Sequence, residues 1–335
     1  MTRSTEEISR KQAENSSPPV AGLPARILLA VPAAVIGAMA VHEVVSRQEP
    51  ATQTHSYWIF LRTALAVSLV LLLIQRWSRG LRRWMGQMFP IIAAAVVLLT
   101  VWAVITSGFR LLPLPYFPSP AGILQSMVED RALLFDSTWH SLLLLLCGYA
   151  LGVATALVTG VCIGWFDQAR YWGMPVLKLI GPIPATAWIP LAMVLSPSQM
   201  MSAVGLIALS VWFPVTMLTV SGIANTRASY LDVARTLGAG NRYLILRVAV
   251  PAAMPSIFIG LFMGLGTSFL TLVMAETVGV KSGLGWYLSW AQGWAEYDKV
   301  YAALIIMAAF FSTIMTIMFK VRDRVLVWQK GMIKW

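Results

Sequence analysis

Charged residues are scarce in this chain. Only 12% of its 335 residues are charged, about half the ~25% that is usual for a soluble domain, whereas 58% are hydrophobic. This composition excludes a disordered protein, a nucleic-acid-binding tail and almost any ordinary soluble enzyme. Several apolar runs of about 18 residues or more instead predict a polytopic α-helical membrane protein.

Cysteine and histidine are also rare. The two cysteines, Cys147 and Cys162, lie fifteen residues apart in one apolar run. Fifteen residues of helix rise about 22 Å, whereas a disulfide needs Cα atoms within ~7 Å of each other. The three histidines are far apart in the sequence and lack the spacing of metal ligands. The sequence therefore predicts neither an internal disulfide nor a metal site.

Catalytic motifs are missing as well. There is no Ser/His/Asp arrangement with useful spacing and no Gly-x-x-x-x-Gly-Lys-Ser/Thr loop for nucleotide phosphates. The nearest sequence to such a loop, Gly279-Val-Lys281-Ser282, lacks the glycine before the lysine. We therefore expect that the chain is not an enzyme and binds no cofactor. If it transports a solute, the energy comes from another subunit or from an ion gradient.

The hydrophobic residues gather in eight apolar segments, each long enough to be read as a membrane span. They cover 27–45, 57–75, 88–107, 138–164, 172–195, 200–223, 251–276 and 300–319. The fold class predicted from this pattern is an all-α polytopic membrane protein with about eight spans.

The basic residues give these spans a direction. The net charge is +11, and most Lys and Arg residues lie in short segments between the apolar runs. If the N-terminus is inside the cell, about three quarters of the 25 Lys and Arg residues fall on the inner side. Inner loops of membrane proteins carry such an excess, so both termini are predicted to lie inside.

Composition divides the chain into three parts. Residues 1–26 form a polar tail that we expect inside the cell. Residues 27–85 hold two accessory spans and a basic linker, and residues 86–335 hold the remaining six spans. Within the six-span part, Gly260 and Gly264 have the spacing that permits close helix approach. They either pack inside the chain or form a homodimer seam or a pore wall.

The inner loop at 224–250 has the pattern of two short helices. The first, at 227–237, carries apolar residues on one face. Gly238 then suits the left-handed position that often follows a helix. A second short helix at 241–249 is expected to end at Pro251. From composition alone, this loop either docks a partner protein or lies on the membrane surface as a simple connection.

The same loop resembles the EAA motif of the permease subunits of ABC importers. That motif has a Glu-Ala-Ala triplet, then a glycine, then an aliphatic residue and a proline. Here Asp232 replaces the glutamate and Val233 replaces the first alanine, and both changes keep the charge or the apolar character. In that family the loop docks into a cleft on a separate ATPase subunit. The coupling residues implied by the resemblance are Asp232, Val233, Ala234, Arg235, Gly238, Val248 and Pro251.

Three further stretches resemble one branch of that family, the nitrate, sulfonate, taurine and bicarbonate importers. They are Phe117-Pro118-Ser119-Pro120, Pro182-x-Pro184-x3-Trp188-x-Pro190-Leu191, and the run from Met274-Ala-Glu276 to Gly283-Leu284-Gly285. The resemblance covers about 100–335. It implies a six-span type I importer permease core, which this chain exceeds by two N-terminal spans whose role the sequence leaves open.

The resemblance also implies the partners. The permeases of that branch generally work as homodimers, with two ATPase subunits that bind ATP and Mg and with a periplasmic or lipid-anchored substrate-binding protein. It implies a multi-pass protein of the bacterial inner membrane. The segment Ser196-Pro197-Ser198-Gln199 departs from the branch's usual sequence, so the substrate is open.

The translocation path is predicted where prolines interrupt a span. A proline disrupts a helix locally, and irregular backbone at membrane depth is stable only when it is buried in protein or lines a cavity. The alternative is a kinked helix that only packs. Glu276 either has a gating or pairing role, with Lys281 as its partner, or is a simple interfacial acid. The candidate path residues are Pro182, Pro184, Thr186, Trp188, Pro190, Trp212 and Glu276.

These features predict an ABC importer permease that moves a small solute by alternating access. The resemblance suggests an oxyanion or a sulfonate as the solute. Two alternatives stay open. One is a secondary transporter driven by an ion gradient, in which Glu276 would be the acidic residue that couples transport to the ion. The other is the same ABC mechanism with an organic solute similar to a thiamine precursor.

Overall fold

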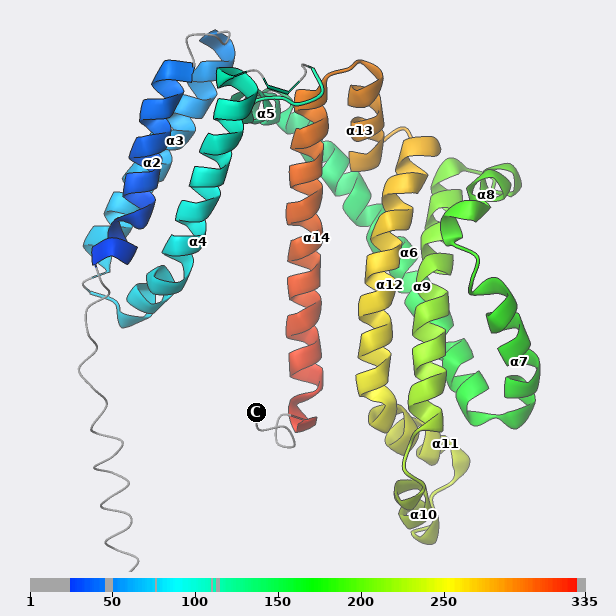
Figure 1. Ribbon diagram of the computed structural model, residues 1–335. Coiled ribbons are helices and arrows are strands. Elements are labelled where there is room, and N and C mark those ends of the chain that lie inside the picture. The colour runs from blue at the N-terminus through cyan, green and yellow to red at the C-terminus, as the bar shows by residue number, and fades with distance from the viewer. Residues whose placement is uncertain (1–24, 46–50, 76, 110, 113–114, 330–335) are drawn as a thin grey trace, which may run out of the picture. The chain divides into compact units, whose positions relative to one another are not determined.

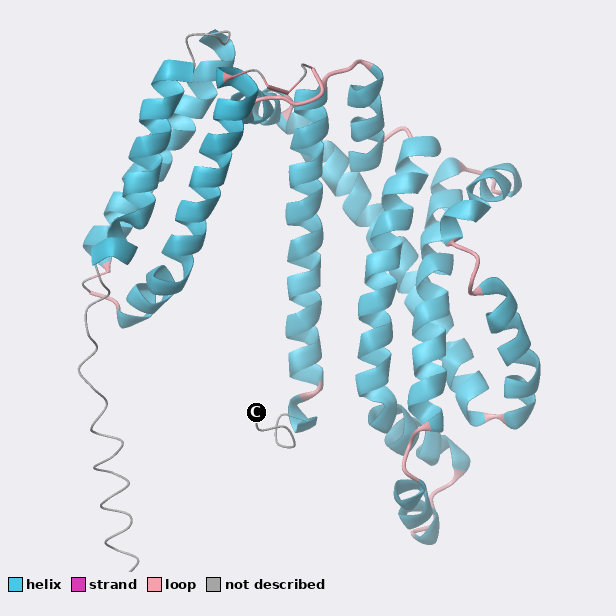
Figure 2. Cartoon of the chain, in the orientation of Figure 1, coloured by secondary structure: helices cyan, strands magenta, loops and turns pink. Residues whose placement is uncertain are grey.

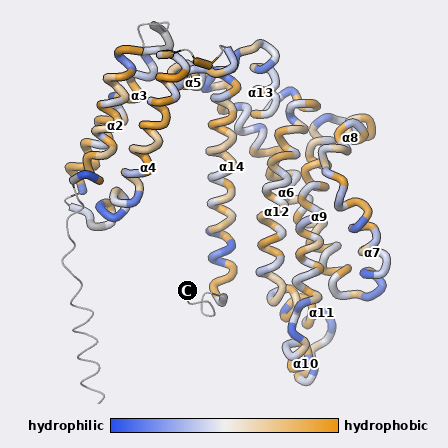
Figure 3. Tube along the Cα trace, in the orientation of Figure 1, coloured by the Kyte–Doolittle hydropathy of each residue, from blue (hydrophilic) through white to orange (hydrophobic). Residues whose placement is uncertain are grey.

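The computed structural model describes residues 25–45, 51–75, 77–109, 111–112 and 115–329, and every regular element in these ranges is a helix (Figure 2). Among the described residues, seven helices are long and apolar enough to cross a membrane (Figure 3). They are Arg26–Val45, Thr54–Ile74, Gly80–Gly108, Arg131–Trp165, Gln199–Ala224, Asn241–Val278 and Tyr297–Val325. The predicted all-α polytopic fold is confirmed.

The chain folds into two compact units, 1–128 and 129–335. The first unit contains helices α2, α3 and α4, the short π-helix η2, and α5 (Figure 1). Their bounds are α2 Ala25–Val45, α3 Ala51–Ile74, α4 Arg79–Ala103, η2 Val104–Gly108 and α5 Pro120–Glu129. The core of this unit joins Val35 of α2, Leu61 of α3 and Phe89 of α4, all almost fully buried. The third predicted span therefore packs against the two accessory spans, and the predicted division at residue 85 stays a prediction.

Helix α4 begins at Arg79, about two and a half turns before the span predicted at 88–107. The side chain of Ser78 accepts a hydrogen bond from the backbone N–H of Leu81, which caps the helix at its first turn. Because Met85 and Phe89 are buried one turn apart, the start of α4 is held against the other helices of the unit. The basic stretch after Ser78 is thus helical, and it forms the first turns of α4.

The second unit is built around α9 (Gln199–Ala224), the most buried of the long helices. It packs against α6 (Arg131–Trp165) and α12 (Val250–Val278). A stripe of small buried residues on α6 recurs at every fourth position: Gly148, Gly152, Ala156, Gly160 and Gly164. A Cβ atom added at Gly148 would lie 2.6 Å from Ile207, and one added at Gly164 would lie 3.0 Å from Ile223. The contacts advance in the same direction on both helices, so α6 and α9 run parallel at close approach.

Helices α9 and α12 approach as closely, in antiparallel order. A Cβ atom added at Gly222 would lie 2.9 Å from Ala253, and one added at Gly264 would lie 3.2 Å from Val211. Gly260 faces Val215 in the same seam. Of the two alternatives for the Gly260/Gly264 pair, the structure therefore shows close packing inside the chain.

The glycine stripe makes a testable contribution to stability. A Cβ atom at Gly152 would lie 2.7 Å from the carbonyl oxygen of Ala208, a backbone atom that cannot turn aside. Gly152→Ala should therefore force α6 and α9 apart and cost about 1–3 kcal/mol. The measurement is the thermal unfolding midpoint in detergent. Gly205→Ala is the matched control, because nothing lies within 4 Å of its added Cβ; equal midpoints for the two variants would refute the close packing.

The span predicted at 172–195 is not one helix. It consists of α7 (Asp167–Ile180), the 3-10 turn η3 (Ala185–Trp188) and α8 (Ile189–Leu195), and the two parts are bent by 83°. Pro182 and Pro184 lie in the break. Neither has a backbone N–H, so two hydrogen bonds of a continuous helix cannot form there. Figure 1 shows α7 beginning beside the end of α6 and α8 leading into the start of α9. Counted as one span, the pair gives the eight predicted spans; the orientation of the termini stays a prediction.

The remaining helices complete the second unit. They are α10 Ala228–Thr236, α11 Asn241–Tyr243, the π-helix η4 Leu244–Ala249, α13 Leu284–Gly293 and α14 Tyr297–Val325. Helix α14 contacts α12 through phenylalanines, with Phe262 and Phe319 4.5 Å apart between ring centroids. At the other end of the bundle, α13 packs between α12 and α14.

Candidate functional site

The predicted coupling loop forms a short helix with a glycine corner. Helix α10 ends at Thr236, and Gly238 follows with a φ of +83°. The backbone N–H of Gly238 donates to the carbonyl of Arg235, and that of Ala239 donates to Ala234. Nothing lies within 4 Å of a Cβ added at Gly238. The glycine is therefore required by the backbone conformation and not by space, as the sequence predicted.

Helix α10 carries an exposed mixture of apolar and charged side chains. Asp232 and Arg235 form an exposed ion pair at 3.3 Å. Val233 is 61% exposed and Leu237 is 83% exposed. Large apolar side chains gathered on a short polar helix are typical of a surface that binds a protein. We define α10 and the corner through Gly238 as the α10 surface.

After the corner at 237–240, the chain enters a helix that runs without a break from Asn241 into α12. Helix α11 and the π-helix η4 continue directly into α12, where the N–H of Val250 donates to the carbonyl of Ile245. The predicted end of this helix at Pro251 is therefore wrong. The π-helix η4 ends at Ala249, and Pro251 lies in the first turn of α12. Proline has no backbone N–H, and the first turn of a helix tolerates this loss. Val248 and Pro251 thus belong to one helical rod, with Ala249 buried against Ile223 of α9.

The break between α7 and α8 opens onto a cavity of about 330 Å³. Gly181, Pro184 and Thr186 line it from the break, and α9 and α12 supply the opposite walls. The polar side chains in these walls are hydroxyls, those of Ser210, Thr267 and Thr271 among them, and none of the lining residues is charged. The hydroxyls of Ser210, Thr267 and Thr271 donate to backbone carbonyls, so the cavity presents their oxygens as acceptors within an apolar surface.

The predicted path residues do not form one cluster. Pro184 and Thr186 line the cavity, and Pro182, Trp188 and Pro190 lie in or beside the same break. The indole Nε1 of Trp188 is buried and lacks a hydrogen-bond partner among the described residues.

Trp212 and Glu276 are absent from the cavity lining. The indole N–H of Trp212 donates to Thr159 at 3.0 Å, and Thr159 contacts Thr216 at 3.1 Å. These three side chains form a polar layer between α6 and α9. Trp212 therefore stabilises the contact between α6 and α9. Its position near the middle of a predicted span did not indicate Thr159 as its partner.

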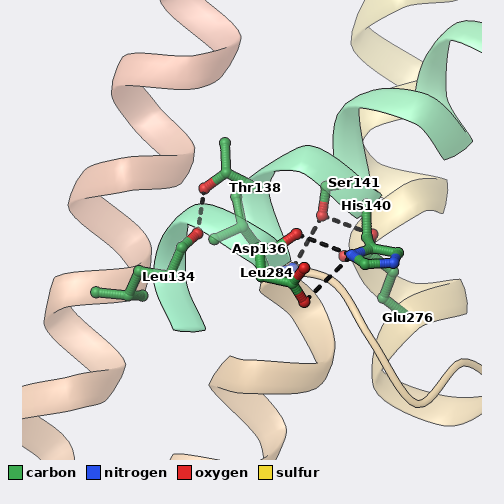
Figure 4. A network of polar contacts seen from close by, with 7 residues as sticks. All are labelled: Leu134, Asp136, Thr138, His140, Ser141, Glu276 and Leu284. Carbon is green, nitrogen blue, oxygen red and sulfur yellow. Dashed lines mark hydrogen bonds and ion pairs between the residues drawn. The ribbon is translucent and has the colours of Figure 1, made fainter. Parts of the chain in front are cut away.

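Glu276 lies at the centre of a buried network (Figure 4). Its side chain is 1% exposed, near the end of α12. The hydroxyl of Ser141 donates to Oε1 at 2.6 Å and accepts the backbone N–H of Leu284 at 2.9 Å. The backbone N–H of Gly285 donates to Oε2 at 2.8 Å. We call Glu276, Ser141 and the two N–H groups the Glu276 network; it joins α6, α12 and the start of α13.

Two glycines make this network possible. Gly283 has a φ of +107°, and a Cβ added there would lie 2.3 Å from Oε1 of Glu276. A Cβ added at Gly285 would lie 2.6 Å from the carbonyl oxygen of Val273. The Gly-Leu-Gly sequence therefore lets the backbone wrap around the carboxylate. In the described chain no ion pair joins Glu276 to Lys281, the partner that the sequence suggested.

A second network holds α13 through its middle. The hydroxyl of Tyr287 donates to Asp130 at 2.7 Å, and Lys299 lies 3.2 Å from the same carboxylate and 2.9 Å from Glu296. Burial and the hydrogen bond to Asp130 raise the pKa of the Tyr287 phenol well above its usual value, so it remains a donor. Within the described residues, no group of three or more His, Cys, Asp or Glu side chains is placed to hold a metal ion.

Comparison with known proteins gives a family match over the second unit. The model of the family described as "binding-protein-dependent transport system inner membrane component" matches residues 148–326. This region contains the α10 surface, the cavity, and Glu276 with its glycines.

Individual relatives are similar over about half of the chain. A probable ABC transporter permease protein of Haemophilus influenzae is 30% identical over 158 residues, 47% of this chain and 64% of that protein. The formylaminopyrimidine transport permease protein ThiX of Halalkalibacterium halodurans is 25% identical over 161 residues, 48% of this chain and 63% of that protein. The putative aliphatic sulfonates transport permease protein SsuC of Bacillus subtilis is 29% identical over 175 residues, which are 52% of this chain and 63% of that protein. The chain thus spans less than two thirds of the length of each of these relatives.

Proposed function

The chain belongs to the family of binding-protein-dependent transport system inner membrane components, and from this premise we propose that it is the permease subunit of an ATP-driven importer in the bacterial inner membrane. The observation that carries the proposal is the α10 surface. It combines the EAA-like positions from Asp232 to Gly238 with exposed apolar side chains, and a short corner joins it to the helix that runs from Asn241 into α12. Such a surface suits docking to an ATPase.

The proposed assembly contains two copies of the chain, two ATPase subunits and a substrate-binding protein. The chain itself binds no cofactor in this proposal, and ATP with Mg is held by the ATPase subunits. Closure of the ATPases would move α10, and the continuous helix from Asn241 to Val278 would carry that motion to the cavity wall. Thr267 and Thr271 of that same helix line the cavity, which supports alternating access through it.

The proposed substrate is a small sulfonate or another oxyanion. The similarity to a sulfonate permease supports this class, and the hydroxyl of Thr186 in the cavity lining is a suitable donor to a sulfonate oxygen. A second candidate is an organic solute such as a pyrimidine. It is favoured by the lack of charge in the mostly apolar lining and by the similarity to a formylaminopyrimidine permease.

The test separates ATP-driven import from a gradient-driven carrier. The chain is co-expressed with the ATPase encoded beside it, and native mass spectrometry gives the stoichiometry of the purified complex. Uptake of taurine or an alkanesulfonate is then measured in vesicles with the binding protein, with ATP or with an imposed ion gradient. We expect a complex of two permeases and two ATPases whose uptake needs ATP and survives an ionophore. Uptake abolished by the ionophore, without a bound ATPase, would contradict the proposal.

Asp232→Arg tests the α10 surface in the same assay. The Asp232–Arg235 pair is exposed, so its loss should cost less than about 1 kcal/mol of folding stability. Reversed charge at a docking surface should weaken ATPase binding at least tenfold, on the order of 1.4 kcal/mol. Asp167→Arg is the matched control, because Asp167 is also exposed and faces an arginine three residues on. Equal ATPase binding by the two variants would place the docking surface elsewhere.

A further inference from the structure

The first unit gathers basic side chains at one end. Helices α2 and α4 both begin at that end (Figure 1), and their parallel packing is fixed by Val35 and Phe89 in one core. Arg26 lies in the first turn of α2, and Arg82 and Arg83 lie in the first turns of α4. The hydropathy colouring marks the same end as hydrophilic (Figure 3). We call these three arginines the basic cluster.

Among the described residues of the first unit, acidic side chains are scarce. Glu43 is the only acidic residue among the described residues up to Val128, where the first unit ends, and it lies close to the opposite end of α2. Within the described residues, no ion pair involves Arg26, Arg82 or Arg83. Several positive charges at one end, with no carboxylate paired to them among the residues that the structure describes, favour an anionic ligand.

The depth of the cluster follows from the helices around it. The apolar helix α3 ends at Ile74, and the buried apolar residues of α4 begin at Met85. The intervening segment must therefore lie where hydrocarbon gives way to lipid headgroups. Trp77 is 90% exposed and Trp84 is 45% exposed in this segment. Exposed tryptophans are typical of the same interfacial layer.

We propose that the basic cluster binds the phosphate groups of anionic phospholipids, and that the accessory helices thereby anchor the chain to anionic lipid. Arginine presents several N–H donors in a planar fork that matches phosphate oxygens. Lipid headgroups are favoured over an acidic partner protein because the flanking tryptophans lie at the depth of the headgroups. This role concerns the first unit, which lies outside the family match, and it stands whatever solute the second unit carries.

Lipid binding is tested on the purified full-length chain by native mass spectrometry. The protein is stripped of bound lipid in detergent, and phosphatidylglycerol or phosphatidylcholine with the same acyl chains is added. We expect wild type to retain phosphatidylglycerol in preference to phosphatidylcholine. Since each arginine near an anionic surface contributes about a fivefold preference, Arg82→Gln with Arg83→Gln should lower phosphatidylglycerol binding at least tenfold. Arg82→Lys with Arg83→Lys should retain most of it.

The control removes two basic residues from the other unit. Lys320 and Arg324 are exposed near the end of α14, beside Asp323, so Lys320→Gln with Arg324→Gln makes the same change in net charge. This control should keep the lipid preference. If the double variant at α4 does not fold, Arg83→Gln alone, at an exposed position, replaces it. Unchanged binding in the α4 variant, or an equal loss in the control, would overturn the proposal; the cluster would then serve a partner protein.

Discussion

Gly238→Pro should release the ATPase subunits from the transporter. Gly238 has a φ of +83°, whereas proline is fixed near −65°. Proline also removes the hydrogen bond from the N–H of Gly238 to the carbonyl of Arg235. The chain would then leave α10 in another direction and displace the α10 surface. A penalty of about 3 kcal/mol on the docking geometry corresponds to a loss of affinity of more than a hundredfold.

Two alanine variants separate this effect from a general weakening of the loop. Gly238→Ala keeps the N–H and adds only the strain of a positive φ, about 1–2 kcal/mol, so ATPase binding should fall about tenfold. Gly240→Ala is the control, since Gly240 lies two residues on with a φ of −75° and nothing within 4 Å of an added Cβ. Native mass spectrometry of the co-expressed complex measures both. Wild-type ATPase binding by Gly238→Pro would show that the corner has no part in docking.

The coupling loop could be predicted because its signals are local. A short amphipathic run followed by glycine indicates a helix end, and the structure places α10 and the left-handed Gly238 where the sequence indicated. The chain beyond Gly238 was predicted less well. Proline usually ends a helix, yet at Pro251 the preceding π turn leads into the start of α12. This backbone adjustment depends on packing such as that of Ala249 against Ile223, and no local pattern records it.

The other features of the site depend on contacts between residues that are distant in the sequence, and these contacts could not be predicted from it. Prolines located the break in the fifth predicted span, but its 83° bend depends on the walls of α9 and α12 around the cavity. The glycine stripe on α6 has the same small-residue spacing as Gly260 and Gly264, so its close packing is readable from the sequence. For Glu276 there was no such signal, because Ser141 lies 135 residues away. A single sequence without homologues cannot pair these two residues.

The other large effect is expected from Glu276→Ala. The carboxylate accepts from the hydroxyl of Ser141 and the N–H of Gly285, and its side chain is 1% exposed. Alanine would leave these donors buried without an acceptor, each at a cost of about 1–3 kcal/mol, and would open a cavity. The start of α13 should then separate from α6 and α12. We expect a fall of several degrees in the unfolding midpoint and faster hydrogen exchange at Leu284, Gly285 and Tyr287.

Variants of similar shape distinguish a structural carboxylate from one that carries a proton or an ion. Glu276→Gln keeps an oxygen that accepts from one N–H group, so it should retain most of the stability and most of the ATP-driven uptake. An ion-coupling acid would lose uptake in this variant while staying folded. Glu296→Ala is the control for charge, because Glu296 is partly exposed and its partner Lys299 keeps Asp130. Its effect on the unfolding midpoint should be much smaller than that of Glu276→Ala.

A double-mutant cycle then tests whether the Glu276 network acts as one unit. Ser141 both donates to Glu276 and accepts from Leu284, so Ser141→Ala alone breaks two hydrogen bonds. If the four groups form one network, the combined variant should cost less than the sum of the single variants, with a coupling of about 0.5–3 kcal/mol. Strictly additive costs would mean that Ser141 and Glu276 hold α13 independently. A coupled result would mean that the Ala-Glu and Gly-Leu-Gly sequences form one structural unit together with Ser141 of α6.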